Sequence, residues 1–356
     1  MKENANGPDT NQINKIQIVE AEGRVNLSPD KMITVSSSPH IKSGETTATI
    51  MTAVIIALLP SLAWGIYIFG FRVLTLTVIS VLSCVIFEFL YQKIMGKPTT
   101  VDDLSAIVTG ILIAFNAPVN TPLWGPVAGA AFAIVIVKQL FGGIGKNIVN
   151  PAIAARIFMF LSFNFMTVFH DINADKIAPF TINPDVIAGA TPLTALKHGI
   201  PSEIGFFSMF LGEKGGCIGE ISVLCLLAGG FYLMWRKIIS WHIPLSFIGS
   251  VALVTYFLPH ETVDGLNFAI SEILSGGLFL GAIFMATDYS TSPITKNGKL
   301  IFGMGCGLIT VFIRYFGAHP EGVSFAIMIM NLFVWYIDKF TKPVRFGGAS
   351  NAEKKK

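Results

Sequence analysis

The feature that most constrains the fold is a succession of apolar stretches, each about as long as a bilayer-spanning helix, across residues 46–340. A spanning helix needs about 20 mostly apolar residues, and short polar or Gly/Pro-rich joints separate stretches of this size. Only 13% of the residues are charged, against about 25% in a typical soluble domain. The sequence therefore predicts an all-α integral membrane protein whose main surroundings are the lipid bilayer.

Ten transmembrane helices are expected. They cover 46–69, 72–95, 103–119, 123–141, 150–169, 216–235, 241–259, 268–287, 299–317 and 321–340.

Charge placement predicts the topology. The polar first 45 residues lack the charged start and apolar core of a signal peptide, so we expect the N-terminus to stay in the cytoplasm. Alternate joints then carry lysine or arginine, Lys138 and Lys146 among them, whereas the outward joints near 118–122, 259–267 and 317–320 carry none. Basic residues favour the cytoplasmic side. We therefore read the net charge of +3 as a topology signal and expect no nucleic-acid partner.

This topology divides the chain into five parts, with both termini in the cytoplasm. They are a cytoplasmic N-terminal segment (1–45), a first five-helix half (46–169), an extracytoplasmic loop (170–215), a second five-helix half (216–340) and a basic cytoplasmic tail (341–356). The prolines of the long loop favour irregular structure over helix. An odd number of helices in each half means that any repeat is inverted across the membrane.

A trace of such a repeat is visible. GILIAFNAPVNTP (110–122) aligns without a gap to GAIFMATDYSTSP (281–293), and in both an apolar run closes in a polar segment that ends in proline. Inverted repeats with interrupted helices occur in membrane proteins whose sites lie between the halves. Two inverted five-helix repeats resemble the architecture of urea transporters.

Thr191 in the long loop has two interpretations. From physical chemistry alone we favour a helix start, with Thr191 as the N-cap and Pro192 at the first helical position. A threonine hydroxyl beside the small residues Gly189 and Ala190 is also open to a bulky covalent group.

A resemblance adds weight to the second interpretation. The pattern Asp185-x-x-x-Gly189-Ala190-Thr191 resembles the motif at which a flavin transferase attaches FMN to threonine through a phosphoester, although Ala188 replaces the usual serine or threonine. Further similarity lies in GGIGKNIVNPA (142–152), MATDYSTSP (285–293) and EGVSFA (321–326). Over about 42–345 the chain resembles the RnfD proteins, which are membrane subunits of the Rnf complex, an ion-translocating ferredoxin:NAD oxidoreductase of the bacterial cytoplasmic membrane. The same family contains NqrB of the sodium-pumping NADH:quinone reductase, which stays an alternative.

The resemblance implies two flavins and several partners. FMN would be covalently bound to Thr191 within the motif that includes Asp185 and Pro192, and a non-covalent riboflavin would lie near Asn147 and Asn150. The simpler role for Asn150 is an N-cap before Pro151. The chain has no dinucleotide fingerprint or iron–sulfur spacing, so the NAD and ferredoxin sites would belong to partner subunits. The family implies iron–sulfur subunits and a second FMN-bearing subunit as partners, and Na⁺ or H⁺ as the coupling ion.

Ionisable residues within the apolar stretches are further candidates. A charge near the centre of a spanning helix costs about 2.5–3.5 kcal/mol on insertion scales, so most of them are expected near helix ends, where they reach water or headgroups, as Arg72 and Arg314 would by snorkelling. We single out Glu272 and Arg156 as candidates for an ion pathway. The four widely spaced cysteines are expected to be buried free thiols.

Two other classes of function compete with this one. A channel or transporter without a redox cofactor would suit the inverted halves, and it predicts uptake by the isolated chain and no flavin. A purely structural scaffold predicts that loss of Thr191 leaves the activity of the complex intact.

Overall fold

The computed structural model describes residues 45–171, 175–182, 188–189, 191–200, 204–259 and 264–342. Residues 1–44 of the expected cytoplasmic segment and residues 343–356 of the expected tail lie outside the described residues. Asp185 and Ala190 of the candidate flavin motif also lie outside them.

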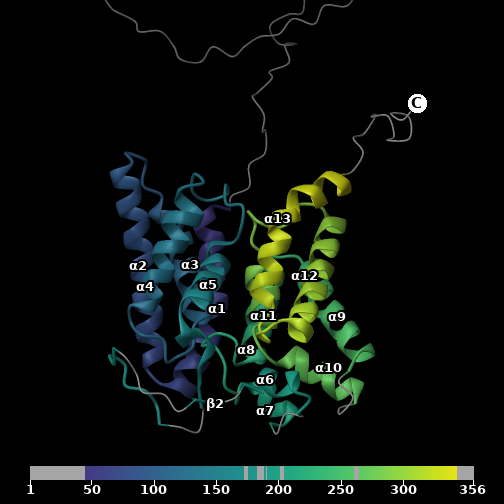
Figure 1. Cartoon of the computed structure of the whole chain (residues 1–356). Coiled ribbons are helices and arrows are strands. Elements are labelled where there is room, and N and C mark those ends of the chain that lie inside the picture. The colour runs from purple at the N-terminus through teal and green to yellow at the C-terminus, as the bar shows by residue number, and fades with distance from the viewer. Residues whose placement is uncertain are drawn as a thin grey trace, which may run out of the picture. The chain divides into compact units, whose positions relative to one another are not determined.

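The first group of helices occupies the predicted first half and is coloured purple to teal in Figure 1. Its elements are α1 (Thr47–Phe69), α2 (Arg72–Ile94), the short η2 (Val101–Asp103), α3 (Ser105–Phe115), α4 (Gly125–Ala131), the π-helical η3 (Phe132–Gln139), α5 (Pro151–Ser162) and the short η4 (Asn164–Thr167).

The connection between the two groups is more ordered than expected. Strands β1 (Phe169–His170) and β2 (Ala188–Gly189) pair antiparallel, with Phe169 opposite Gly189. Two short helices follow, α6 (Pro192–Lys197) and α7 (Phe206–Leu211). The prolines that suggested irregular structure include Pro192, which instead starts α6 because its fixed φ suits the first helical turn.

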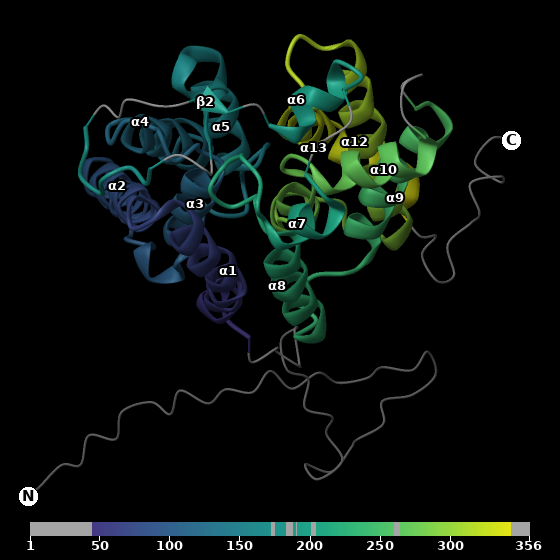
Figure 2. The same ribbon diagram turned by 90° about the horizontal axis from the view of Figure 1, so that it is seen from below.

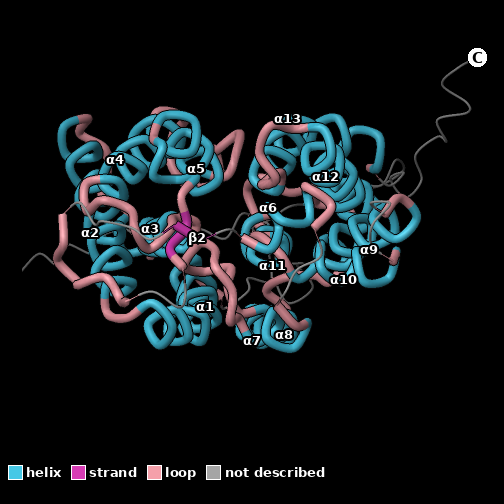
Figure 3. Tube along the Cα trace, turned by 60° about the horizontal axis from the view of Figure 1, so that its bottom comes forward, coloured by secondary structure: helices cyan, strands magenta, loops and turns pink. Residues whose placement is uncertain are grey.

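The second group of helices contains α8 (Val223–Trp235), α9 (His242–Phe257), α10 (Gly265–Leu274), α11 (Leu278–Leu280), the π-helical η5 (Gly281–Met285), α12 (Lys296–Phe316) and α13 (Val323–Thr341). Figures 2 and 3 both show α1–α5 on one side and α8–α13 on the other. Contacts of α1 with α8 and of α5 with α13 join the two groups.

Every predicted span contains helix, but few of the helices are long. Among the described residues, α1, α2, α12 and α13 are long and apolar enough to cross a membrane, and α10 with α11–η5 forms a fifth candidate bent by 63°. Five other apolar helices have 10–17 residues. The chain is thus a mostly helical, multi-pass membrane protein, while ten spans in an inverted repeat stay a prediction.

Two helices end inside the protein and do not continue to its surface. Helix α3 stops at Phe115, and α10 stops at Leu274, after which Gly276 has a φ of +65° that favours glycine. The α10–α11 break means that the segment predicted as one span over 268–287 is bent.

Small residues bring the helices close together. A Cβ on Gly229 of α8 would clash with the carbonyl oxygen of Ala57 in α1, and one on Gly110 of α3 would lie 2.6 Å from Cα of Val81 in α2. Membrane helices commonly approach one another through small residues, because lipid supplies little hydrophobic driving force for their association. These contacts hold the interrupted helices in place around the candidate sites.

Candidate functional site

Helix α5 connects two cavities. The Asn147 cavity, of about 90 Å³, lies at its start, where Asn150 and Pro151 line the wall. The Thr191 cavity, of about 220 Å³, lies near its end and is lined by Phe160. The helix rises by 1.5 Å per residue, so the two ends are separated by roughly 15 Å.

Thr191 is the N-cap of α6, as its sequence predicted. Its Oγ1 accepts a hydrogen bond from the Thr194 backbone N–H at 3.3 Å and shares another with Thr194 Oγ1 at 2.8 Å. Pro192 stands at the first helical position. Both threonines also line the Thr191 cavity, although Thr191 is only 8% exposed. The capping role and a hydroxyl at the cavity wall therefore coexist.

The rest of the Thr191 cavity suits a phosphate joined to an aromatic ring system. Lys197, His198 and His319 line it, together with Phe160 and Phe169. Lys197 Nζ donates to the carbonyl oxygens of Gly317 and Ala318, so within the described part of the chain one of its three N–H donors stays unused. The volume lies below the roughly 300–1,000 Å³ of whole-ligand pockets, so the cavity is too small to enclose a ligand of the size of FMN completely.

Gly189 has a packing role that the sequence did not reveal. A Cβ there would lie 3.1 Å from Cα of Asp171, beside the β1–β2 pair. Its missing side chain lets the two chain segments approach.

The two asparagines of the Asn147 cavity differ. Asn150 caps α5, since its Oδ1 accepts from the N–H of Ala152 at 2.9 Å, and its Nδ2 donates to the carbonyl of Met285 at 3.2 Å. Asn147 Oδ1 is buried and has no hydrogen-bond partner among the described residues. Buried polar atoms without a partner are uncommon, so Asn147 is the better ligand candidate. At about 90 Å³ the cavity accepts a flavin ring only if its walls open.

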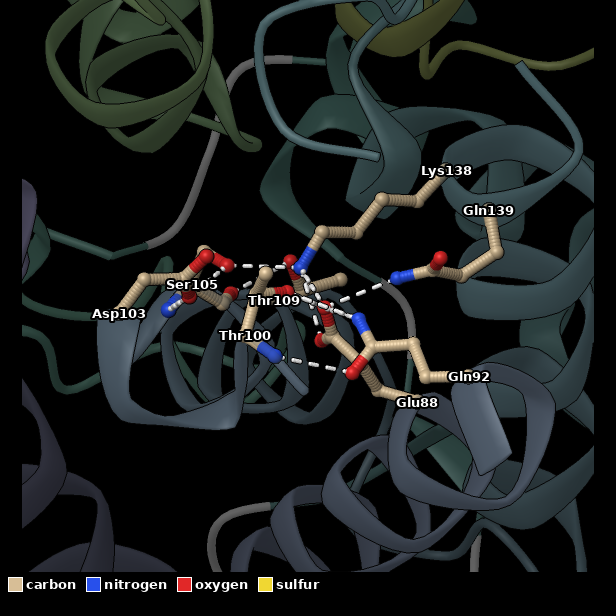
Figure 4. Close-up of polar contacts among 8 residues, drawn as sticks. All are labelled: Glu88, Gln92, Thr100, Asp103, Ser105, Thr109, Lys138 and Gln139. Atoms are coloured by element: carbon tan, nitrogen blue, oxygen red, sulfur yellow. Dashed lines mark hydrogen bonds and ion pairs between the residues drawn. The ribbon is translucent and has the colours of Figure 1, made fainter. Parts of the chain in front are cut away.

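Figure 4 shows a buried ion pair between Glu88 and Lys138, and Lys138 also lines the Asn147 cavity. Lys138 Nζ lies 2.8 Å from both carboxylate oxygens of Glu88 and 2.6 Å from Ser105 Oγ. Gln139 Nε2 donates to the same carboxylate at 2.9 Å. Lys138 is 2% exposed, because η3 turns its side chain inward, where Glu88 neutralises it. Its place at a cytoplasmic joint stays a prediction.

Arg156 lies halfway along α5, between the two cavities. Its guanidinium donates to Asn116 Oδ1 at 2.7 Å and to the Glu321 carboxylate, and it lies 3.9 Å from Cys217 Sγ. Glu321 in turn lines the Thr191 cavity. The sequence motif around Glu321 marked a resemblance, but nothing in its spacing pointed to a pairing with Arg156.

Glu272 belongs to a third ion pair. Arg314 NH1 lies 2.6 Å from its carboxylate and 2.7 Å from its carbonyl oxygen. Arg156 and Glu272, the two predicted ion-pathway residues, therefore belong to different ion pairs.

Snorkelling was the wrong expectation for most of these charges. Arg72 is fully buried and donates to the carbonyl oxygens of Val119, Thr121, Ala178 and Thr181. Arg314 is 4% exposed. Carbonyl groups at or beyond the ends of helices and in the inter-group connection are left without helical partners inside the protein, and these arginines satisfy several of them.

The cysteines are free thiols, as expected. Cys84, Cys217 and Cys306 are buried, and Cys225 is half-buried. Cys217 lies with Glu220 and Glu321 in a group whose donor atoms are all within 4.8 Å of one another.

Comparison with known proteins identifies the family. The sequence matches the model of the NQR2, RnfD, RnfE family over residues 34–347. The chain belongs to this family. One relative of this chain is a protein of Acetobacterium woodii that is named as the D subunit of a Na⁺-translocating ferredoxin:NAD⁺ oxidoreductase complex. The two sequences are 47% identical over 88% of this chain and 95% of that protein.

Other relatives carry related names. The D subunit of a proton-translocating ferredoxin:NAD⁺ oxidoreductase complex in Clostridium ljungdahlii is 37% identical, over 89% of this chain and 96% of that protein. The D subunit of an ion-translocating oxidoreductase complex in Aliivibrio salmonicida is 34% identical, over 88% and 98%. These relatives confirm the resemblance to RnfD. By their names, they are subunits of a redox enzyme complex.

Proposed function

We propose that the chain is the flavin-carrying RnfD subunit of an Rnf-type complex, which passes electrons between ferredoxin and NAD⁺ and couples them to Na⁺ or H⁺ transport. The complex would lie in a bacterial cytoplasmic membrane, with both termini of this chain inside and Thr191 outside. The names of the relatives support the redox class over a channel without cofactor or a passive scaffold. The observation that supports a covalent flavin is the position of the Thr191 hydroxyl, which lies at the wall of a cavity lined by basic and aromatic side chains.

FMN joined to Thr191 would supply reversible electron transfer, while the protein supplies position and electrostatics. Lys197 and His198 would stabilise the negative charge of the phosphoester. Phe160 and Phe169 would exclude water from its surroundings. Helix α6 would fix the point of attachment, because Pro192 and the Thr194 N–H hold Thr191 at the helix start.

A second flavin, riboflavin, would bind at the Asn147 cavity. The unpartnered Oδ1 of Asn147 would accept a hydrogen bond from it, and the Lys138 side chain, whose charge Glu88 balances, lines the same wall. Asn150 would hold the start of α5 beside it. Binding requires this cavity to open, so the proposal for riboflavin depends on movement of its walls.

The proposal assigns the remaining chemistry to partners. Iron–sulfur subunits and a second FMN-bearing subunit would receive or supply the electrons, and a flavin transferase would attach FMN during maturation. The NAD and ferredoxin sites would lie on those other chains.

The decisive experiment is coexpression with the flavin transferase, followed by in-gel fluorescence of the denatured chain and intact mass. We expect labelling of the wild type and its loss in Thr191→Ala, with Thr191→Ser retaining the hydroxyl and at least part of the label. Thr194→Ala is the matched control, because its hydroxyl lines the same cavity 2.8 Å from that of Thr191.

Loss of the label in Thr194→Ala alone would move the attachment to Thr194. An unlabelled wild type, or equal labelling of Thr191→Ala, would refute covalent flavin at this site. Loss of the Thr191 cap costs about 0.5–2 kcal/mol, so the unlabelled variant is still expected to fold.

A further inference from the structure

Six charged side chains gather around the α10–α11 break. Their charges act on one another from α5, the α7–α8 connection, α10, α12 and the α12–α13 connection. They are Arg156, Lys214, Glu220, Glu272, Arg314 and Glu321. Three are basic and three acidic, so the set is neutral when all of them are ionised.

Two of the acids are already paired. Arg156 neutralises Glu321, and Arg314 neutralises Glu272. Glu220 has no ion-pair partner within 4 Å among the described residues, although it is 3% exposed. A buried carboxylate without a counter-charge is costly, so the surroundings of Glu220 are the part of the cluster that needs explanation.

The two oxygens of Glu220 differ. Oε1 accepts a hydrogen bond from the Cys217 N–H at 3.0 Å. Oε2 is buried and has no hydrogen-bond partner in the described part of the chain. It faces Gly277 at the helix break, where a Cβ would lie only 2.8 Å away. The unused oxygen therefore points to a place that carries no side chain.

Other donors surround this place. A carboxylate oxygen of Glu321 and Cys217 Sγ each lie within 4.8 Å of a Glu220 oxygen. Ser275, at the same break, has a buried hydroxyl without a partner among the described residues. Interrupted helices with free oxygens are the usual cation sites of membrane transport proteins.

Lys214 can change the charge of the cluster. Its Nζ donates to the carbonyl of Leu274 at the end of α10. The pKa of Lys214 is lowered to about 8: burial lowers it, the nearby Glu220 carboxylate partly opposes this, and Arg314 adds a smaller lowering effect. When Lys214 releases its proton, the six groups carry two positive and three negative charges, which leaves one negative charge uncompensated.

We propose that Glu220, at the α10–α11 break, holds one exchangeable monovalent cation, H⁺ or Na⁺, and that Lys214 supplies the balancing charge when this cation leaves. The assignment rests on the ion-translocating function proposed above and names the residues that carry it. Arg156 stays paired with Glu321, and Arg314 stays paired with Glu272, so neither arginine neutralises Glu220.

The Thr191 cavity offers a route for coupling. Glu321 lines that cavity and also holds Arg156, which lies 3.3 Å from the Cβ position of Gly277. Negative charge that arrives in the cavity raises the affinity of the nearby cluster for a cation, because the interior screens charges poorly. An electron near Thr191 thus favours cation binding at Glu220.

The test uses the complete complex in proteoliposomes, driven by reduced ferredoxin and NAD⁺. Uptake of radioactive sodium and of protons, the latter with an internal pH dye in sodium-free buffer, is measured per electron transferred. Glu220→Gln is expected to abolish uptake of the coupling ion per electron transferred, because it removes the carboxylate that binds this ion. Glu213→Gln is the matched control, since Glu213 is exposed in the same segment, and it should behave as wild type.

The ion whose uptake disappears in Glu220→Gln identifies the occupant. Wild-type uptake of both ions per electron in that variant overturns the proposal. If Glu220→Gln does not assemble, Gly277→Ala replaces it: the charge stays, but the added methyl group fills the place beside Oε2. It should weaken the cation dependence of uptake, and an unchanged dependence overturns the proposal.

A separate measurement distinguishes this site from the flavin. The Thr191→Ala complex, with no flavin on that residue, should still exchange one cation per Glu220, followed as sodium binding or as proton release on titration. Loss of exchange upon adding Glu220→Gln supports the site whatever the labelling of Thr191 shows. Equal exchange with and without Glu220→Gln overturns it.

Discussion

The Glu88–Lys138 pair allows a quantitative test of the buried interior. Lys138→Met removes the ammonium group that lies 2.8 Å from both Glu88 oxygens, and Glu88 is 0% exposed. Breaking a buried pair on one side costs about 3–5 kcal/mol, because the remaining charge is left uncompensated. Gln139 still donates to Glu88 at 2.9 Å, so we expect a loss near the lower end, about 3 kcal/mol.

The reverse change leaves the opposite charge. Glu88→Gln strands the Lys138 ammonium, which keeps only Ser105 Oγ at 2.6 Å among its charged or hydroxyl partners in the described part of the chain. The double variant Glu88→Gln/Lys138→Met removes both charges. Because replacing both members of a buried pair is often close to neutral, the double variant should be more stable than either single variant.

The assay is a double-mutant cycle on the thermal or denaturant stability of the purified complex, followed by size-exclusion chromatography. The expected coupling energy is about 3 kcal/mol, at the upper end of the range for groups in contact. Lys93→Met is the control, since Lys93 is exposed on the same helix as Glu88 and should change stability by less than about 0.5 kcal/mol. A double variant that loses the sum of the two single losses would refute the reasoning.

Three further predictions concern other parts of the chain. Gly229→Ala should destabilise the α1–α8 contact, where its Cβ would clash with a carbonyl oxygen, whereas Gly249→Ala, which meets nothing within 4 Å, should stabilise α9 by about 0.5–1 kcal/mol; thermal stability distinguishes them. Asn150→Ala should cost about 1 kcal/mol through the lost cap, whereas Asn147→Ala should leave stability almost unchanged and lower the content of extractable riboflavin. The pKa of Lys214 is about 8 when folded and 10.5 ordinarily, so the unfolded chain holds more protons between these values. Wild type should gain stability relative to Lys214→Met as pH rises through that window.

Much of the helical framework was predictable. Apolar length alone located helix in every predicted span, and Asn150-Pro151 and Thr191-Pro192 identified two helix starts, which the structure confirms. Local rules succeed here because capping and proline geometry depend only on neighbouring residues.

The pairing of the charges was not predictable. Arg156 and Glu321 are 165 positions apart, and Glu88 and Lys138 are 50 apart. A single sequence contains no signal for such contacts, and the cost of burying a charge misleadingly favoured helix ends and water. The bend between α10 and α11 was missed for a related reason, since Gly276 within an apolar run is typical of a continuous membrane helix.

The sequence by itself determined that the protein lies in a lipid bilayer, where the helices of its predicted spans lie, and the motif around Thr191. Apolar length, caps and short motifs are local properties, so a single sequence shows them. Only the tertiary structure decided which charges are neutralised, which asparagine stays free and that the Thr191 cavity meets a buried ion cluster. These depend on how interrupted helices from the two halves of the chain pack, and packing joins residues that the sequence keeps far apart.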